Sequence, residues 1–405
     1  MILSAPGRPL KLAVIEQGFI MGGAEVNLLW LLPGLRQSGF DPLVICPREG
    51  EVTRQFSAAG IACHILPLPA FPSVSFRLLG RKLPNPAACL WDAAAIHIAA
   101  RRLASELRAV GADVVCTTGL FAHLYGGRAA ALAGLPCVWH LQDIVSPTRA
   151  GGLFRRMLRK TAASVRPGVA AISAPVAASV EGLGLDVSIV PNGVSLGEAP
   201  TGEERAAARG RIGVSPGCPV AGIVGRITPW KGQLEFVQAA ALARQSLPDA
   251  RFVIVGACAP NDLWYSRKVE QLIAREGLQS AVSVLGWQQS IHEIMQALDV
   301  LVLASQEPEP FGRVLIEAMA ACTPVVATAH GGAAEIVEDG VTGLLVPPGD
   351  TRALAGAMQA LLADPARARR MGIEGRRVAA RRYSLQSFVS NMSDVLHGAA
   401  GRADG

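Results

Sequence analysis

The sequence predicts an α/β protein with two Rossmann-like domains, each of them a doubly wound parallel sheet. The chain has 405 residues, of which 50% are hydrophobic and only 17% are charged. This length exceeds the size at which a single hydrophobic core stops growing. Short β-branched runs alternate with longer helical stretches, and the alternation lapses once, near residue 200, before it restarts.

The first half of the chain shows the strand–helix alternation that is typical of a parallel sheet. A helix over residues 24–37 should follow the first strand and a glycine-rich loop. Six runs are expected to form strands: Leu12–Ile15, Pro42–Ile45, Ala62–Leu66, Asp113–Cys116, Pro136–Trp139 and Val187–Val190. We therefore predict an N-terminal Rossmann-like domain over residues 1–195.

The second half begins with a segment rich in Gly, Pro and charge, residues 196–218, which we expect to be a linker with one short polar helix. The next strands are expected at Pro219–Val224, Arg251–Val255, Val282–Leu285, Asp299–Leu303, Pro324–Ala327 and Leu344–Val346. They predict a second Rossmann-like domain over 219–383. Ligands of such sheets bind beyond the carboxyl ends of the strands, so we expect both rows of loops to line one site.

Composition excludes several classes of protein. The eight cysteines show no CxxC and no paired Cys/His spacing, which disfavours a zinc site and a disulfide framework. No apolar run is long enough to span a bilayer, and the first residues lack the features of a secretory signal. Aromatic residues make up only 5%, which makes nucleic acid a poor fit. We expect a cytoplasmic protein with reduced thiols.

Two glutamates eight positions apart, Glu309 and Glu317, mark the most informative segment. Phe311, Gly312 and Arg313 follow the first glutamate and open a helix, whose free backbone N–H groups form a ready anion site. Glu317 lies inside that helix among apolar neighbours. A buried carboxylate needs hydrogen-bond donors, and two ribose hydroxyls would serve.

Two further segments follow predicted strands. Arg226 and Lys231 flank a tight turn and are well placed to clamp a diphosphate. Gly22 and Gly23 precede a helix and allow the backbone to approach phosphate or sugar closely. Their spacing is not GxGxxG, which disfavours a nicotinamide site. Each segment alone could be an ordinary turn, but together they indicate one site for a phosphorylated ligand.

Together these segments resemble family 4 of the retaining glycosyltransferases, with its E-x7-E signature. The resemblance covers nearly the whole chain and is strongest from Val220 to Asp350. One departure is Ala334, where a proline is common in the family. The resemblance implies the GT-B fold, in which an acceptor-binding domain and a donor-binding domain face a central cleft. It also implies that the segment 384–405, with a helix over about 385–396, crosses back to the first domain.

The resemblance also implies a role for each candidate residue. Glu309 would hold hydroxyls of the donor sugar, and Glu317 would bind the ribose. Arg226 and Lys231 would neutralise the leaving diphosphate. The other donor contacts would come from Gly22 and Gly23, from the backbone amides of Phe311, Gly312 and Arg313, and from the loop with Leu285 and Trp287 beside the base. His140, expected to end a strand of the first domain and to point into the cleft, would have a catalytic role in contact with the sugar or phosphate near the reacting carbon.

No Asp-x-Asp metal site is apparent, so we expect a metal-free mechanism in which cationic side chains and helix amides stabilise the diphosphate. The family is thought to use a same-face displacement, in which the departing phosphate helps to deprotonate the acceptor hydroxyl. The expected donor is a UDP- or GDP-linked sugar, with no cofactor. An inverting GT-B transferase, a nucleotide-sugar epimerase and a non-catalytic sugar-nucleotide-binding subunit stay open as alternatives.

The positive charge is concentrated in the first half. Residues 1–195 hold 18 basic and 11 acidic residues, whereas residues 196–405 hold 20 and 21, for a net charge of +6. Phe71–Pro84 and Leu153–Lys160 combine basic and apolar residues, and the second segment resembles an amphipathic helix. Such segments suit an anionic membrane, although an ordinary solvated helix is the alternative. We expect a glycan or lipid-linked acceptor, in polysaccharide or glycolipid biosynthesis.

Overall fold

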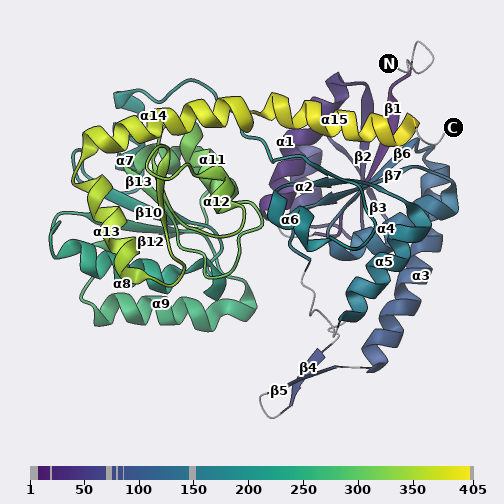
Figure 1. Ribbon diagram of the computed structural model, residues 1–405, viewed down its shortest axis with the longest axis horizontal. Coiled ribbons are helices and arrows are strands. Elements are labelled where there is room, and N and C mark those ends of the chain that lie inside the picture. Colours follow the sequence, from purple (N-terminus) through teal and green to yellow (C-terminus); the bar gives the residue numbers. More distant parts are fainter. Residues whose placement is uncertain are drawn as a thin grey trace. The chain divides into compact units, whose positions relative to one another are not determined.

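The computed structural model describes residues 8–18, 21–69, 75–78, 81–84, 86–145 and 152–401. The chain divides into two compact units, one formed by Met1–Gly193 with Leu385–Gly405 and the other by Val194–Ser384. Each unit is built on one parallel sheet (Figure 1). Within the described residues, no helix has the length and apolar character that crossing a membrane requires.

The sheet of the first unit has seven strands in the order β3-β2-β1-β6-β7-β8-β9. They are β1 (Leu10–Ile15), β2 (Phe40–Cys46), β3 (Ala62–Ile65), β6 (Val114–Thr118), β7 (Cys137–Leu141), β8 (Gly168–Ala171) and β9 (Val187–Ile189). Six of the seven were predicted. The sequence of β8, GVAA, has a single β-branched residue among small ones, so it gave no strand signal.

Helices cover both faces of this sheet. Leu12 and Val14 of β1 share a core with α1 (Gly23–Gln37), α2 (Glu51–Ala58) and α15 (Leu385–Gly401). On the opposite face Gly126 of α4 (Leu120–Ala133) lies against Ile15 and Thr117. The helices α3 (Pro86–Ala109) and α5 (Leu153–Val165) flank α4, and α6 (Ala174–Ser179) contacts β8 and β9. The first unit is therefore doubly wound, as predicted.

A short antiparallel pair lies apart from the main sheet of the first unit. It consists of β4 (Ser75–Leu78) and β5 (Arg81–Pro84). This pair was not predicted, and it occupies most of the basic and apolar segment Phe71–Pro84. The side chains of that segment lie outside the described residues, so its expected membrane contact stays a prediction.

The sheet of the second unit has six strands in the order β12-β11-β10-β13-β14-β15. They are β10 (Val220–Val224), β11 (Arg251–Val255), β12 (Val282–Gly286), β13 (Val300–Leu303), β14 (Val325–Thr328) and β15 (Gly343–Val346), and all six were predicted. From β10 the chain adds β11 and β12 on one side of the sheet, and from β13 it adds β14 and β15 on the other side. Such a pair of neighbours is a topological switch point, where ligands of doubly wound sheets bind.

The helices of the second unit surround this sheet. They are α7 (Gly202–Arg211), α8 (Gln233–Arg244), α9 (Leu263–Arg275), α10 (Ile291–Ala297), α11 (Arg313–Ala320), α12 (Ala333–Ile336), α13 (Thr351–Leu362) and α14 (Pro365–Arg382), with short 3-10 turns η2 (Pro229–Lys231) and η3 (Pro260–Asp262). Alternate residues of the strands of this sheet pack with α8, α9 and α13 in one hydrophobic core.

The segment 196–218, predicted to be a linker with one short helix, is part of the second compact unit. It contains α7, which packs on α10 within the second unit. Thr201 caps this helix by accepting a hydrogen bond from the Glu204 amide at 3.2 Å. Arg209 forms an ion pair with Asp299 at the start of β13. Sequence composition suggested a linker because the helix buries only one of its side chains, Ala208.

Candidate active site

The candidate residues of the second unit follow three strands of one sheet. Arg226 and Lys231 come after β10, Leu285 and Trp287 lie at the end of β12, and Glu309 comes after β13. Because the strands are parallel, their carboxyl ends meet at one edge of the sheet. The segments after β10 and β13 are neighbours there, at the switch point.

The Lys231 ammonium and the Glu309 carboxylate form the centre of this site. Lys231 Nζ lies 3.0 Å from Glu309 Oε1 and 2.9 Å from Oε2, and the two side chains are 15% and 9% exposed. The buried Ser305 hydroxyl donates a hydrogen bond to Glu309 Oε2 at 2.8 Å. Lys231 Nζ also lies 4.1 Å from the centre of the Trp230 ring. The carboxylate is therefore held in one orientation from two sides.

The backbone around Glu309 is packed too tightly for larger residues. The Gly332 amide donates to the Glu309 carbonyl at 2.7 Å. A Cβ atom at Gly331 would lie 2.4 Å from the same carbonyl oxygen, and φ at Gly331 is +62°. On the β10 side, a Cβ at Gly232 would lie 1.9 Å from the Ala304 carbonyl oxygen. Gly232 allows the segment that carries Lys231 to approach the segment after β13, and Gly331 allows the segment after β14 to approach Glu309.

Glu317 already has a partner within its own helix. Arg313 Nε donates to Glu317 Oε1 at 2.7 Å, one helical turn away, and both side chains are largely buried. The donor that a buried carboxylate requires is therefore supplied partly by Arg313. Gly312, with φ of +101°, precedes the first turn of α11, and the buried Phe311 ring packs edge-on against Tyr383. The proposed ribose and sugar contacts of this helix stay predictions.

Two candidate residues are open to solvent. The Arg226 side chain is exposed, and it forms no ion pair among the residues that the structure describes. Its carbonyl accepts a hydrogen bond from Gln233 Nε2 at 2.8 Å, which fixes the backbone of the turn. Trp287 is 60% exposed, beside the half-buried Leu285. Both exposed side chains are free to contact a ligand.

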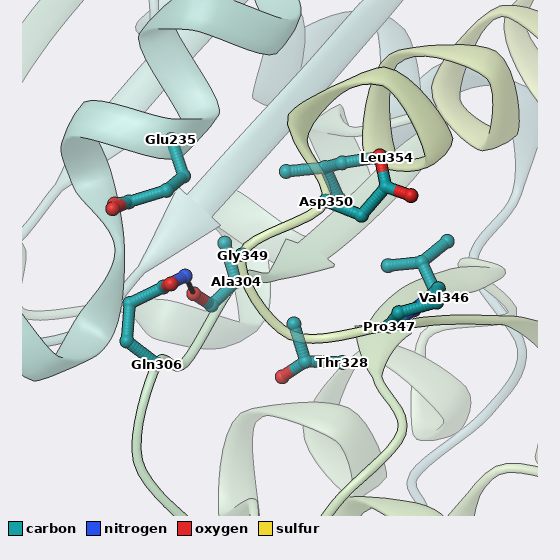
Figure 2. A pocket seen from close by; sticks show the side chains of 9 residues that line it. All are labelled: Glu235, Ala304, Gln306, Thr328, Val346, Pro347, Gly349, Asp350 and Leu354. Atoms are coloured by element: carbon teal, nitrogen blue, oxygen red, sulfur yellow. Dashed lines mark hydrogen bonds between the residues drawn. The ribbon is translucent and has the colours of Figure 1, made fainter.

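A small cavity adjoins this site (Figure 2). Its volume of about 10 Å³ suits a single water molecule. The Thr328 hydroxyl in its wall donates to the Ser305 carbonyl at 2.9 Å, so hydrogen bonds connect the wall to Glu309. Glu235 also lines it; its Oε2 has no hydrogen-bond partner among the described residues, and burial raises the pKa of this carboxyl.

The candidate residues Gly22 and Gly23 of the first unit lie at the start of α1. The Gly22 amide donates to Glu25 Oε2 at 2.9 Å, so the helix caps itself with its own carboxylate. Apart from the neighbouring residues and the backbone of the helix, no described atom lies within 4 Å of the position that a Cβ of Gly23 would occupy. The space beside Gly23 is therefore open, while the Gly22 amide is already engaged.

A buried glutamate that the sequence analysis did not single out lies next to this loop. Glu16 Oε1 accepts from the Gly18 amide at 2.7 Å, and Oε2 is hydrogen-bonded to the Thr118 hydroxyl at the end of β6. Burial and the charge of Glu25 raise the pKa of Glu16 to about 7. Its place at the end of β1, the switch-point strand, was the signal that could have identified it.

His140 lies near the end of β7, as predicted, and its side chain is buried. Its Nε2 lies 2.9 Å from Gln142 Nε2, and its ring centre lies 6.1 Å from that of Phe388. Gln142 Oε1 in turn accepts from Asn27 Nδ2 at 3.2 Å. Burial lowers the pKa of His140 to about 4, so the ring is neutral at pH 7. Its role near the reacting carbon stays a prediction.

The helix α5 confirms the amphipathic helix predicted for Leu153–Lys160, and two of its apolar side chains face the core of the first unit. Phe154 and Leu158 are 5% and 1% exposed, and the Phe154 ring packs against Phe121. Arg155 donates to the Ser179 carbonyl at 2.6 Å. Phe154 and Leu158 therefore belong to the core of the first unit, and the exposed basic residues of α5 remain available to a membrane.

Among the described residues, no group of three or more His, Cys, Asp or Glu side chains is arranged to hold a metal ion. The charged groups at the switch point of the second unit are instead Lys231, Glu309 and the nearby Arg226. Positive side chains at the carboxyl edge of a doubly wound sheet are suited to a ligand with phosphate groups.

Comparison with solved structures identifies the class of this fold. HepE of Anabaena, solved in complex with UDP and glucose, is 26% identical and matches with a TM-score of 0.79 over 96% of this chain and 100% of that chain. Sucrose-phosphate synthase from Thermosynechococcus elongatus, 20% identical, shares the fold with a TM-score of 0.76 over 97% of this chain and 100% of that one. The two units together have the GT-B fold.

Sequence comparisons give the family. Residues 204–378 match the model described as glycosyl transferases group 1, and residues 21–198 match glycosyltransferase family 4. The alpha-maltose-1-phosphate synthase of Mycolicibacterium smegmatis is 33% identical over 69% of this chain and 76% of that protein. The chain belongs to family 4 of the glycosyltransferases.

The match to other curated relatives is shorter. The D-inositol 3-phosphate glycosyltransferase of Nocardia farcinica is 39% identical over 191 residues, which are 46% of this chain. The alignments with this relative and the alpha-D-kanosaminyltransferase of Streptomyces kanamyceticus span only 42% and 50% of those proteins.

Proposed function

We propose that this protein transfers a sugar from a nucleoside diphosphate sugar to a hydroxyl of a glycan or lipid-linked acceptor. The observation that carries the proposal is the Lys231–Glu309 pair at the switch point of the second unit. Membership of family 4 supports the reaction type. UDP in the HepE structure supports uridine as the first donor base to test.

The geometry suggests how the pair would work. Transfer leaves negative charge on the departing diphosphate, and fixed cations that face this charge lower the barrier. Lys231 and the exposed Arg226 would supply these cations. Glu309, held by Lys231 and Ser305, would accept hydrogen bonds from hydroxyls of the donor sugar and fix its anomeric carbon for attack.

We propose that the reaction needs no divalent metal, because Arg226 and Lys231 take the place of one at the diphosphate. Activity should survive EDTA at concentrations that remove magnesium and manganese. Loss of activity in EDTA with recovery on addition of either ion would contradict this part of the proposal.

We further propose that the anomeric configuration of the donor sugar is retained. Retention by same-face displacement needs the departing phosphate near the acceptor hydroxyl, and it needs no separate base in the first unit. His140 and Glu16 fit this requirement, since both side chains are buried and neither is exposed to an acceptor. A product of inverted configuration in the NMR spectrum would refute it.

The decisive experiment is a donor screen. Nucleoside diphosphate sugars with uridine and guanosine should be tested for a rise in melting temperature, because bound ligand stabilises the folded state. The donor that stabilises the protein most should also be hydrolysed slowly without an acceptor. Binding without hydrolysis or transfer to any glycan or lipid-linked acceptor would indicate a non-catalytic sugar-nucleotide-binding protein instead.

We also propose a setting in polysaccharide or glycolipid biosynthesis, with the protein attached peripherally to an anionic membrane. The excess of basic residues in the first half of the chain supports this attachment. Because the apolar residues of α5 are buried, the attraction would rest on charge and would weaken as salt rises.

A further inference from the structure

Three neighbouring helices of the first unit carry an unusual concentration of positive charge. The helices α3, α4 and α5 lie side by side on one face of the sheet (Figure 1). Together they contain eight basic and two acidic residues, an excess that equals the net charge of +6 of the whole chain. Both acidic residues are on α3. Oε1 of one of them, Glu106, lies 3.2 Å from Nε2 of His64. The helices α4 and α5 have no carboxylate.

A groove of about 350 Å³ runs between these helices. It is lined by His97 and Ala100 of α3, Arg128, Ala131 and Leu132 of α4, and Ser164 of α5. Three of these side chains can donate hydrogen bonds. Exposed basic residues flank it one helical turn away, Arg101 beyond His97 and Lys160 before Ser164.

Arg128 is the residue that this groove leaves unexplained. Its side chain is half-buried, and no hydrogen bond or ion pair joins its guanidinium to another described residue. Other arginines of this layer are engaged: Arg108 donates to the Leu132 carbonyl and Arg155 to the Ser179 carbonyl. The half-buried guanidinium of Arg128 therefore has no described protein partner and lines a groove where it can bind an anion from outside.

We propose that this groove binds the phosphate group of an anionic phospholipid and that the layer of α3, α4 and α5 is the face that docks on the membrane. The planar guanidinium of Arg128 matches two phosphate oxygens, and His97 and Ser164 supply further donors. Leu132, which is 49% exposed, would contact the apolar part of the lipid. The inference rests on the peripheral membrane contact proposed above and not on the transfer reaction.

Two substitutions within this layer distinguish a headgroup site from a diffuse positive surface. Arg128→Gln and Arg156→Gln remove the same charge, but Arg156 is exposed on α5 and does not line the groove. Arg156→Gln removes one charge from a diffuse positive surface and should weaken binding to phosphatidylglycerol vesicles about fivefold. Loss of Arg128 should weaken it about fiftyfold, because a charge-assisted hydrogen bond to phosphate is lost as well.

The experiment is co-sedimentation of the full chain with phosphatidylglycerol and phosphatidylcholine vesicles at low salt. Arg267→Gln on α9 of the second unit should leave binding unchanged. Equal effects of Arg128→Gln and Arg156→Gln, or no preference of the wild type for phosphatidylglycerol, would overturn the proposal. If Arg128→Gln lowers the melting temperature, Arg128→Lys should be used in its place. Vesicle binding by Arg128→Lys that equals the wild type would also overturn the headgroup site.

Donor turnover measured on the same variants separates the two proposals. Arg128→Gln should hydrolyse donor like the wild type, since Arg128 belongs to the first unit, whereas Lys231 and Glu309 belong to the second. Vesicle binding without turnover in the wild type would count against the transferase proposal alone. Turnover without vesicle binding would count against the lipid site alone.

Discussion

The two units share one topology, but they differ in electrostatics at the same topological position. In the second unit, Lys231 and Glu309 form an ion pair at the switch point between β10 and β13. In the first unit, the switch point between β1 and β6 holds Glu16, which is buried and hydrogen-bonded to Thr118. The fold therefore fixes where a ligand can bind, and the loop residues decide which charge it meets.

This difference indicates how a phosphate would be received at each place. The second unit offers cations, whereas Glu16 and Glu25 surround the Gly22 loop of the first unit with carboxyl groups. Two ionised carboxylates would repel a phosphate at this loop. Since the pKa of Glu16 is raised to about 7, its protonation near neutral pH removes one of these charges.

The largest effect is expected from Glu309→Gln, which removes the negative charge from the centre of the second unit's site. Turnover should fall a hundredfold or more, about 2.7 kcal/mol in the barrier, while nucleotide binding stays near wild type. Steady-state kinetics and calorimetry with UDP measure the two effects. Glu307→Gln, at an exposed position two residues away, is the control and should be active. Undiminished turnover in Glu309→Gln would remove the residue from the site.

The next effect concerns stability in the first unit. Native Glu16 has a pKa of about 7 against an ordinary 4.5, so between these pH values the folded state holds a proton that the unfolded state has released. This contribution to stability is therefore present below pH 4.5 and is lost as pH rises to 7. Glu16→Gln, which stays neutral, should gain about 2.5 kcal/mol relative to wild type between pH 5 and pH 8.

Denaturant unfolding of both proteins at pH 5 and pH 8 measures this gain. The pKa values of His123 and His140 are lowered by burial and act in the opposite direction, but they are common to both proteins and cancel in the difference. Glu181→Gln, at an exposed position of the same unit, provides the control. If wild type and Glu16→Gln lose stability in parallel, Glu16 does not carry the buried proton.

Arg226→Ala tests whether the exposed cation of the second unit binds the donor. A hydrogen bond to a charged group contributes about 1.5–3 kcal/mol, so the affinity for UDP should fall about thirtyfold. Because the side chain is exposed, the melting temperature should not change. Arg251→Ala, at the amino end of β11 on the opposite edge of the sheet, should bind UDP like the wild type. Equal affinities of the two variants would place Arg226 outside the donor site.

The smallest effect is expected from Ser305→Ala. The hydroxyl positions Glu309 without touching substrate, so its loss should lower kcat about tenfold and leave UDP affinity unchanged. Thr323→Ala removes another buried hydroxyl of the same unit, which donates to the Met295 carbonyl at 2.7 Å, and serves as the control for stability. A fall in kcat of equal size in both variants would reduce Ser305 to a structural role.

The strands could be predicted because buried parallel strands appear as continuous β-branched runs, and β8 was missed because it is made of small residues. Lys231 and Glu309 could each be selected because they follow such strands. Their ion pair joins residues 78 positions apart, and no spacing rule predicts it. The ion pair between Arg313 and Glu317 could have been predicted from their i, i+4 spacing on a helix. We predicted instead that Glu317 binds the ribose of a ligand.

The sequence could not show the direction in which a side chain faces. The basic and apolar residues of α5 have the pattern of a membrane-binding helix, and the same pattern results when the apolar stripe faces a core. For His140, the sequence predicted the position near a strand end but not the burial of the ring. Tertiary packing decides both cases.

The helix α15 has a consequence for synthesis of the chain. Phe388, Met392 and Leu396 enter the core of the first unit, beside residues of β1, β2 and α1. A ribosome releases this helix only after the whole second unit has been made. During synthesis the apolar surface of the first unit that α15 covers therefore stays exposed until the second unit is complete. The first unit thus departs from the usual rule that domains fold in the order of their synthesis. The second unit, whose residues are contiguous, can fold while the first is still incomplete.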